Sequence, residues 1–432
     1  MVGAVPEPMR AGRPTLFWIA GMGVALAGLL VGVWAWAQFV RAQEARAPHG
    51  YLAQTDFNLL FAHARLIAAG QGDKIYDFAT QHAAQLALIE PNTQLGGGQI
   101  NHYWPILGGL LVPVAGWSPE AALILWVGLS AVAFTIALGI LLRELGYDWR
   151  GGLLFAVAAW AFIPHIIDLE QAQTTDLLML PLICGILALR RGADWQAGLW
   201  LGLLGLKPQL TPVWIIAMLA AGRLRGLAGF AACTGVLLGV STLLSGPGWL
   251  GAWWELSRYS LNLPGGHGFD VALSHNFREL MVGLPGGASG TLNPIQLAVS
   301  ALVGLGVAAI WWRTPATAGQ GVSGNYRLAL TVLAMLISSP YLDTHDLAFW
   351  LPAGAFLLAP APAAADSLPN RRLWIGLSWA GWALAWPAVL LLTSSPIKIA
   401  AFYMVGVTIM ILWAWWRTGT PVLRRTTRAP AA

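Results

Sequence analysis

The sequence predicts an all-α protein, a polytopic bundle of transmembrane helices, and three observations support this fold class. Of the 432 residues, 57% are hydrophobic and only 10% are charged, whereas a soluble domain carries about a quarter charged residues. Apolar runs as long as a bilayer span, about 20 residues, recur from end to end. The chain also has 24 tryptophans, and indole rings favour the membrane interface.

About twelve segments are candidate spans. The first, 15–39, is too long for a signal-peptide core and lacks a small-residue cleavage site, so we expect it to be retained. The others run over 119–142, 151–167, 174–189, 195–206, 210–222, 226–245, 292–312, 327–339, 346–359, 373–393 and 398–416.

Two of these regions are broken. Pro208 in LKPQL interrupts 195–222, and SSPYLDTHD interrupts 327–359. Non-helical backbone at membrane depth is stable only where it is buried in protein or lines a cavity. We therefore expect re-entrant or broken helices with their turns inside the protein.

The remaining organisation follows from the distribution of basic residues. Sixteen of the 24 Lys and Arg residues fall on one set of segments, in short loops and at both termini, so the positive-inside rule places that set in the cytoplasm. We expect a cytoplasmic N-terminus at 1–14, a membrane domain at 15–416 with outer loops 40–118 and 246–291, and a basic cytoplasmic tail at 417–432. Charges scattered over short loops also argue against nucleic-acid binding.

Within the first outer loop, helices are expected near 56–69 and 77–89, followed by a re-entrant or surface-lying helix within 102–117. Ionisable side chains gather at the breaks that this topology places outside the membrane. Because ionisable groups within a membrane are costly, they mark a functional site by default.

Each candidate also has a structural explanation. The carboxylate of Asp56 could cap a helix, and Lys207 could extend its ammonium to the interface. The spacing of His165, Asp168 and Glu170 could hold a metal. No His or Cys cluster strengthens that arrangement, so we expect no metal or other cofactor.

Five segments together resemble glycosyltransferase family 87. They are TDFNLLFAHARLIAAGQGDKIYD at 55–77, HYWPILGGLLVP at 102–113, GLKPQLTPV at 205–213, SHNFREL at 274–280 and SSPYLDTHDLAFWLP at 338–352. Their order and spacing carry the resemblance, which extends over about 50–415. The sequence departs from the family pattern at 103–105, where Tyr-Trp-Pro replaces a double proline.

This resemblance implies a GT-C fold, a many-helix membrane bundle with its active site at the outer face of the cytoplasmic membrane. It also implies transfer of a hexose, commonly mannose, from a polyprenyl-phosphate sugar to a lipid or glycan acceptor, with inversion. The resemblance assigns the catalytic carboxylate to Asp56. We expect His345 to act beside it, and we expect the substrate-binding residues to be Tyr103, Asp168, Lys207, Gln209, Asn276, Arg278 and Asp346.

Such a transfer needs a base for the acceptor hydroxyl proton, which a carboxylate can supply. It also needs positive charge for the departing phosphate. Lys207, Arg278 and His345 are the candidates for that charge.

Two alternatives remain. A transporter or flippase would also contain broken helices, but it predicts polar breaks on both sides of the membrane, whereas here they fall on one. A non-catalytic scaffold would not need Asp56 near the outer surface with cationic residues facing it.

Overall fold

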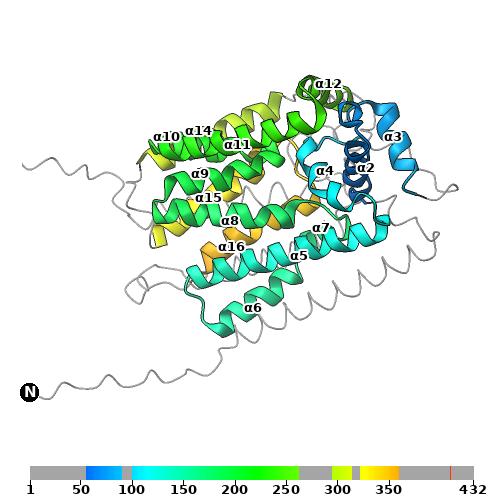
Figure 1. The fold of residues 1–432 in the computed structure, drawn as a ribbon. Coiled ribbons are helices and arrows are strands. Elements are labelled where there is room, and N and C mark those ends of the chain that lie inside the picture. Colours follow the sequence, from blue (N-terminus) through cyan, green and yellow to red (C-terminus); the bar gives the residue numbers. More distant parts are fainter. Residues whose placement is uncertain (1–54, 90–99, 262–293, 314–321, 360–408, 410–432) are drawn as a thin grey trace, which may run out of the picture.

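The computed structural model describes residues 55–89, 100–261, 294–313, 322–359 and Ile409, and within these residues the chain is helical without any strand. The predicted spans 15–39 and 373–393, the span 398–416 apart from Ile409, and the segments 1–14 and 417–432 lie outside the described residues. Figure 1 shows the arrangement of the helices.

The α-helices are α2 (Phe57–Ala68), α3 (Phe78–Leu86), α4 (Pro105–Leu111), α5 (Pro119–Glu144), α6 (Trp149–Trp160), α7 (Ile163–Glu170), α8 (Thr175–Arg191), α9 (Asp194–Gly202), α10 (Pro212–Ala220), α11 (Leu224–Ser245), α12 (Trp249–Leu261), α14 (Pro294–Arg313), α15 (Val322–Ser338) and α16 (Trp350–Leu358). Short 3₁₀ segments are η2 (Gly72–Lys74), η3 (Val112–Val114), η4 (Leu203–Leu206), η5 (Pro208–Leu210) and η7 (Thr344–Phe349).

Three of the described helices, α5, α11 and α14, are long and apolar enough to cross a membrane. The pair α6 and α7, bent by 52°, would make a fourth span if it crosses as one unit. The described residues therefore make a helical membrane protein, but they do not confirm about twelve spans. The predicted spans 195–206 and 210–222 correspond to α9 and α10, which have 9 residues each and so extend only about 14 Å each.

Both predicted breaks are present. Between η4 and η5 the backbone of Lys207 leaves the helical region, with φ −122° and ψ 81°. The second break separates α15 from η7. The predicted helices of the first outer loop are also confirmed as α2 and α3, and the stretch 102–117 forms only the 7-residue α4 and η3.

The basic residues of the short loops lie at one end of the bundle. Arg191 pairs with Glu144 where α8 and α5 end. Arg223 lies 2.5 Å from Asp194 where α10 gives way to α11. In Figure 1 these connections lie at the left-hand ends of the helices, whereas α2, α3 and α4 lie at the right. Arg191 and Arg223 therefore lie at the end of the bundle opposite α2, α3 and α4, and the side of the membrane that each end faces stays a prediction.

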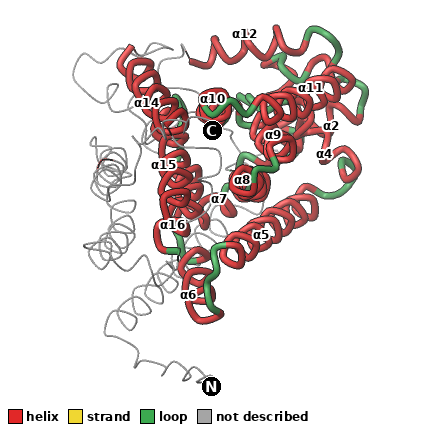
Figure 2. Tube along the Cα trace, turned by 90° about the vertical axis from the view of Figure 1, so that its left-hand side faces the viewer, coloured by secondary structure: helices red, strands yellow, loops and turns green. Residues whose placement is uncertain are grey.

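Helices α9 and α11 pack backbone to backbone. A Cβ atom added to Gly198 would lie 1.9 Å from the carbonyl oxygen of Gly226, and one on Gly229 would lie 2.4 Å from the carbonyl oxygen of Trp195. Small residues allow such close approach in membranes. Figure 2 looks along α8, α9 and α11, with α12 crossing above them. Because α9 leads into the Lys207 turn, this contact fixes where the turn lies.

Candidate active site

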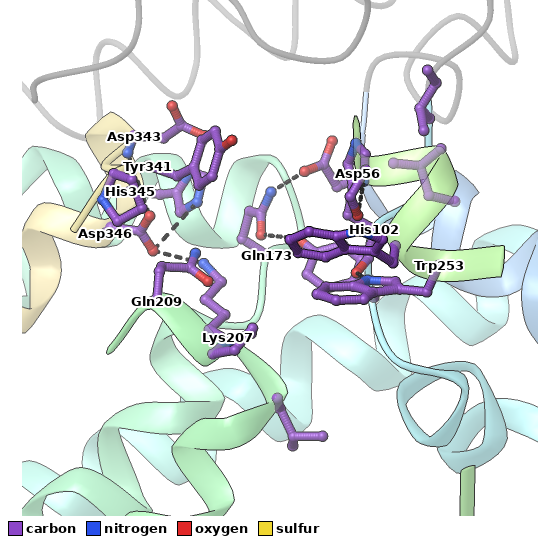
Figure 3. Close-up of a pocket in the computed structure, with 18 residues that line it drawn as sticks. Asp56, His102, Gln173, Lys207, Gln209, Trp253, Tyr341, Asp343, His345 and Asp346 are labelled. Carbon is purple, nitrogen blue, oxygen red and sulfur yellow. Dashed lines mark hydrogen bonds and ion pairs between the residues drawn. The ribbon is translucent and has the colours of Figure 1, made fainter. Parts of the chain in front are cut away.

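A cavity of about 360 Å³ lies where the two broken regions meet the first outer loop. Figure 3 shows Lys207 and residues of the η7 region on one side, Asp56, His102 and Trp253 on the other, and Gln173 between them. The lining residues are Asp56, Leu59, Ile100, His102, Tyr103, Gln173, Leu206, Lys207, Pro208, Gln209, Trp253, Trp254, Ser257, Pro340, Tyr341, Asp343, His345 and Asp346.

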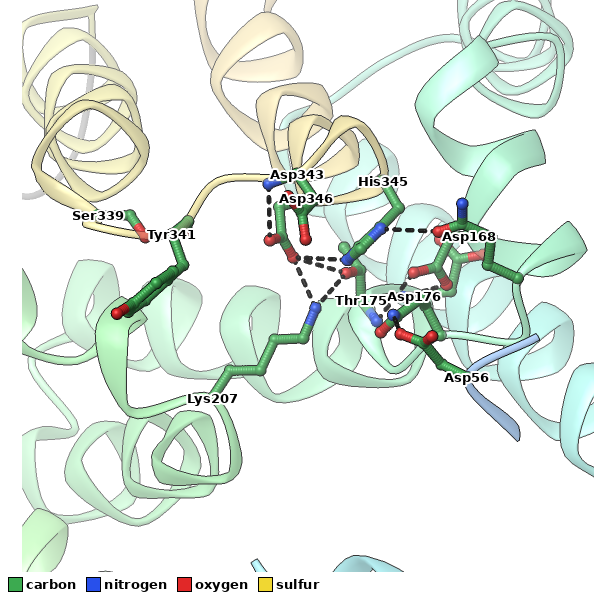
Figure 4. A network of polar contacts seen from close by, with 12 residues as sticks. Asp56, Asp168, Thr175, Asp176, Lys207, Ser339, Tyr341, Asp343, His345 and Asp346 are labelled. Atoms are coloured by element: carbon green, nitrogen blue, oxygen red, sulfur yellow. Dashed lines mark hydrogen bonds and ion pairs between the residues drawn. The ribbon is translucent and has the colours of Figure 1, made fainter. Parts of the chain in front are cut away.

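A buried ion pair connects the two broken regions (Figure 4). The Nζ atom of Lys207 lies 2.6 Å from Oδ1 of Asp346 and also donates to Oγ1 of Thr175 at 3.0 Å. Only 5% of the Lys207 side chain is exposed. The hydroxyl of Thr175 in turn donates to Asp346. Lys207 is therefore held inside the protein and does not extend to the interface.

The turn before η7 is closed by its own carboxylates. Asp343 and Asp346 form a capping box, in which the N–H of Asp343 donates to Oδ2 of Asp346 at 3.3 Å. A capping box satisfies two backbone donors reciprocally. Asp346 thus holds both the turn and Lys207.

His345 lies between Gln171 and Asp346. Its Nδ1 atom lies 3.2 Å from Oε1 of Gln171, and because an amide oxygen can only accept, Nδ1 carries a proton in this contact. Its Nε2 atom lies 3.6 Å from Oδ1 of Asp346. Burial lowers the pKa of His345 to about 3, although Asp346 opposes the shift. The imidazole is therefore neutral near pH 7, and among the described cavity residues the positive charge belongs to Lys207.

Asp56 stands at the start of α2 but does not cap it, because its side chain accepts no hydrogen bond from the first turn. The carboxylate instead accepts a hydrogen bond from Nε2 of Gln173. Burial raises the pKa of Asp56 to about 7, and the Asp343 carboxylate adds to the shift while Lys207 opposes it. The capping explanation is therefore wrong, and the carboxylate can exchange a proton near neutral pH.

Some of the other predicted site residues line the cavity, and others lie outside the described residues. Tyr103 and Gln209 line the cavity with Lys207, His345 and Asp346. Asn276 and Arg278 lie outside the described residues.

Asp168 lies behind the wall and is not among the lining residues. Its two carboxylate oxygens accept the N–H groups of Thr175 and Asp176. It thus caps the first turn of α8, and its predicted contact with substrate is not part of this arrangement.

His165 is also fully buried, 2.8 Å from Asp176 and stacked on Phe134. Among the described residues no group of three or more metal-ligating side chains could hold an ion.

Several cavity residues escaped the sequence analysis. Gln173 and the aromatic pair Trp253 and Trp254 belong to no chemical motif. The segment 249–261 reads in the sequence as part of a Gly- and Pro-rich loop, but it forms helix α12. The one available signal was its concentration of tryptophan.

An apolar helical bundle whose cavity brings carboxylates, a buried lysine and a histidine together defines an integral membrane protein with a site for a polar group. The model of glycosyltransferase family 87 matches residues 101–340. The chain belongs to this family and is a membrane glycosyltransferase. No curated protein and no solved structure matches it. The matched range includes Gln173 and Lys207 but neither Asp56 nor His345, so their assignment depends on the earlier resemblance and on the cavity.

Proposed function

We propose that the protein transfers a hexose, mannose in our proposal, from a polyprenyl-phosphate donor to a glycan or glycolipid acceptor, with inversion, at the outer face of the cytoplasmic membrane. The observation that carries this proposal is Asp56. It opens a helix without capping it, lines the cavity, and has a pKa of about 7. A general base is most effective when its pKa lies near the operating pH.

In the proposed reaction the Asp56 carboxylate takes the proton of an acceptor hydroxyl. The hydroxyl oxygen forms a bond to the anomeric carbon of the sugar. The bond from that carbon to the phosphate oxygen breaks, and its electron pair leaves with the phosphate. A single displacement of this kind inverts the anomeric centre and needs one carboxylate.

Lys207 is the cation that we assign to the departing phosphate, because positive charge in a water-excluded site stabilises developing negative charge. Its pairing with Asp346 balances its charge, so we propose Arg278 as a second cation. A neutral His345 would donate or accept a hydrogen bond.

The cavity also suits a donor that carries a lipid. Leu59, Ile100, Leu206, Trp253 and Trp254 line it with apolar surface. The prenyl chain could therefore remain in an apolar environment while the sugar phosphate reaches Lys207. A helical membrane bundle with a cavity at its broken helices supports the GT-C assignment in the same way.

The test is sugar transfer by the purified Asp56→Asn variant from a radiolabelled polyprenyl-phosphate mannose donor to a mixture of membrane glycolipids. An amide cannot take the proton, and general-base assistance contributes about 10²–10⁴-fold. Activity of the variant within about threefold of the parent would show that Asp56 is not the base.

Folding is checked in the same preparation. Because the pKa of Asp56 is raised on folding, its ionisation lowers stability as the pH rises from about 4 through about 7. Asn does not ionise, so thermal stability at pH 8 should equal or exceed that of the parent.

A further inference from the structure

The turn between α7 and α8 contains the one non-glycine residue with a positive φ among the residues that the structure describes, Ala172 at +49°. The turn closes α7 through two hydrogen bonds. The N–H of Gln173 donates to the carbonyl of Asp168 at 2.8 Å, and the N–H of Ala172 donates to that of Leu169 at 3.2 Å. This pattern is a Schellman motif, whose left-handed position is usually glycine.

The strained turn is held firmly in place. Ala172 is 1% exposed, and Nε1 of Trp126 on α5 donates to its carbonyl oxygen at 3.0 Å. Left-handed backbone in an L-residue is unfavourable and persists only where the surroundings enforce it. Strained backbone of this kind is common at functional sites. The two residues that flank Ala172 are therefore candidates for a functional role.

Gln173, on one side, fixes Asp56. Its Oε1 atom accepts the hydroxyl of Tyr103 at 2.5 Å, and its Nε2 atom donates to Oδ2 of Asp56. Because an ionised carboxylate can only accept hydrogen bonds, the donating end of the amide faces Asp56, and the amide oxygen accepts the hydroxyl of Tyr103. The N–H of Asp56 also donates to the carbonyl of Gln171 at 3.1 Å, so backbone and side chain are both tied to this turn.

Gln171, on the other side, contacts His345, whose Nδ1 atom lies 3.2 Å from Oε1. Gln171 and Gln173, the two neighbours of Ala172, therefore contact the proposed base and the neighbouring imidazole, which come from distant parts of the chain. In Figure 3 Gln173 lies between the two sides of the cavity.

We propose that the turn Gln171–Gln173 is the positioning element of the active site: Gln173 orients the Asp56 carboxylate toward the acceptor hydroxyl, and Gln171 orients His345. This inference rests on the proposed function. Gln173 acts through Asp56: it occupies one carboxylate oxygen and leaves the other to take the proton. A backbone conformation that can relax only at a cost keeps the separation of the two groups constant.

The principal test is Gln173→Met, which keeps the length of the side chain but removes both hydrogen bonds. A hydrogen bond to a carboxylate favours its charged form, so its loss should raise the pKa of Asp56. The acidic limb of the kcat–pH profile should move up by about one unit. The plateau kcat should fall roughly 10- to 100-fold, since misplacing a reacting group can cost that much. The KM for the donor should change less than twofold.

A double-mutant cycle distinguishes positioning from a general structural role. In the Asp56→Asn background, Gln173→Met should have no further effect on the residual rate, because residues that act as a unit are strongly non-additive. An equal fold-loss in both backgrounds would refute the proposal. Gln171→Met should lower kcat without moving the acidic limb, which belongs to Asp56.

Gln85→Met is the matched control. Gln85 is a buried glutamine on α3 that does not line the cavity. The Gln85→Met substitution should reduce thermal stability but leave the acidic limb of the kcat–pH profile at the parent's pH.

If Gln173→Met does not fold, Gln173→Glu replaces it, because the carboxylate can still accept the hydroxyl of Tyr103. Its added negative charge should raise the acidic limb further.

The two proposals fail differently. Normal activity of Asp56→Asn would overturn the proposed function. An inactive Asp56→Asn beside a Gln173→Met variant with the parent's plateau and pH profile would overturn the positioning role alone.

Discussion

The pH dependence of kcat tests the proposed base directly, because the charged groups that surround Asp56 are known. With a pKa of about 7 for Asp56, the ionised fraction is ~9% at pH 6 and ~91% at pH 8. The rate should therefore rise about tenfold across this interval if Asp56 is the base. An aspartate with its usual pKa near 3.8 would be ionised throughout, and the rate would not change.

Two neighbouring charges should move this limb in opposite directions. The Asp343 carboxylate raises the pKa of Asp56 and Lys207 lowers it. Asp343→Asn should therefore shift the acidic limb to lower pH, and Lys207→Met should shift it to higher pH. The direction of each shift is independent of how much either substitution reduces the plateau.

The assay is initial-rate sugar transfer at saturating donor and acceptor between pH 5 and pH 9. Tryptophan fluorescence at each pH checks that the protein remains folded. A parent acidic limb below about pH 5 would refute the assignment of the limb to Asp56. So would shifts of the same sign in the Asp343→Asn and Lys207→Met variants.

Three further predictions address the donor, the packing and the topology. Lys207→Gln should raise the KM for the donor more than the KM for the acceptor, and equal changes in steady-state kinetics would contradict the phosphate assignment. Gly198→Val should lower the thermal midpoint and the yield of folded protein, because even its Cβ would meet the carbonyl of Gly226 at 1.9 Å; an unchanged midpoint would contradict this packing. In a variant without the native cysteines, a membrane-impermeant thiol reagent outside the cell should label Cys at position 70 but not at position 191, and labelling at 191 would invert the topology.

Local signals in the sequence predicted much of this fold. Proline after Lys207 and the polar run before His345 mark the two breaks, because proline removes a helix donor and polar groups need partners. Both breaks occur where expected. Helix ends that carry neither a proline nor a run of polar residues were not predicted. The predicted span 151–167 ends before α7 does at Glu170, because Ala172 occupies the left-handed position where glycine would mark a helix end.

The charged residues of the candidate site could be predicted from the sequence, whereas its uncharged residues could not. Asp56, Lys207 and Asp346 could be selected because ionisable groups are conspicuous in an apolar sequence. Their partners could not be selected, since the pairing of Lys207 with Asp346 and of Asp56 with Gln173 depends on three-dimensional contacts between distant segments. The contacts of Asp168 could not be predicted for the same reason, because its carboxylate accepts backbone N–H groups of α8, and backbone groups carry no sequence signature.

The ion pair between Lys207 and Asp346 also constrains how the protein is made. The two residues are 139 positions apart in the chain, and a ribosome adds about 5–20 residues per second. Roughly 7–28 s therefore pass between synthesis of the lysine and synthesis of its counter-charge. During that interval the Lys207 ammonium lacks its counter-charge Asp346, and an uncompensated charge is unfavourable in lipid. We therefore expect the hairpin of α9 and α10 to reach its final depth only after η7 has been synthesised, so that this site is assembled late in biogenesis.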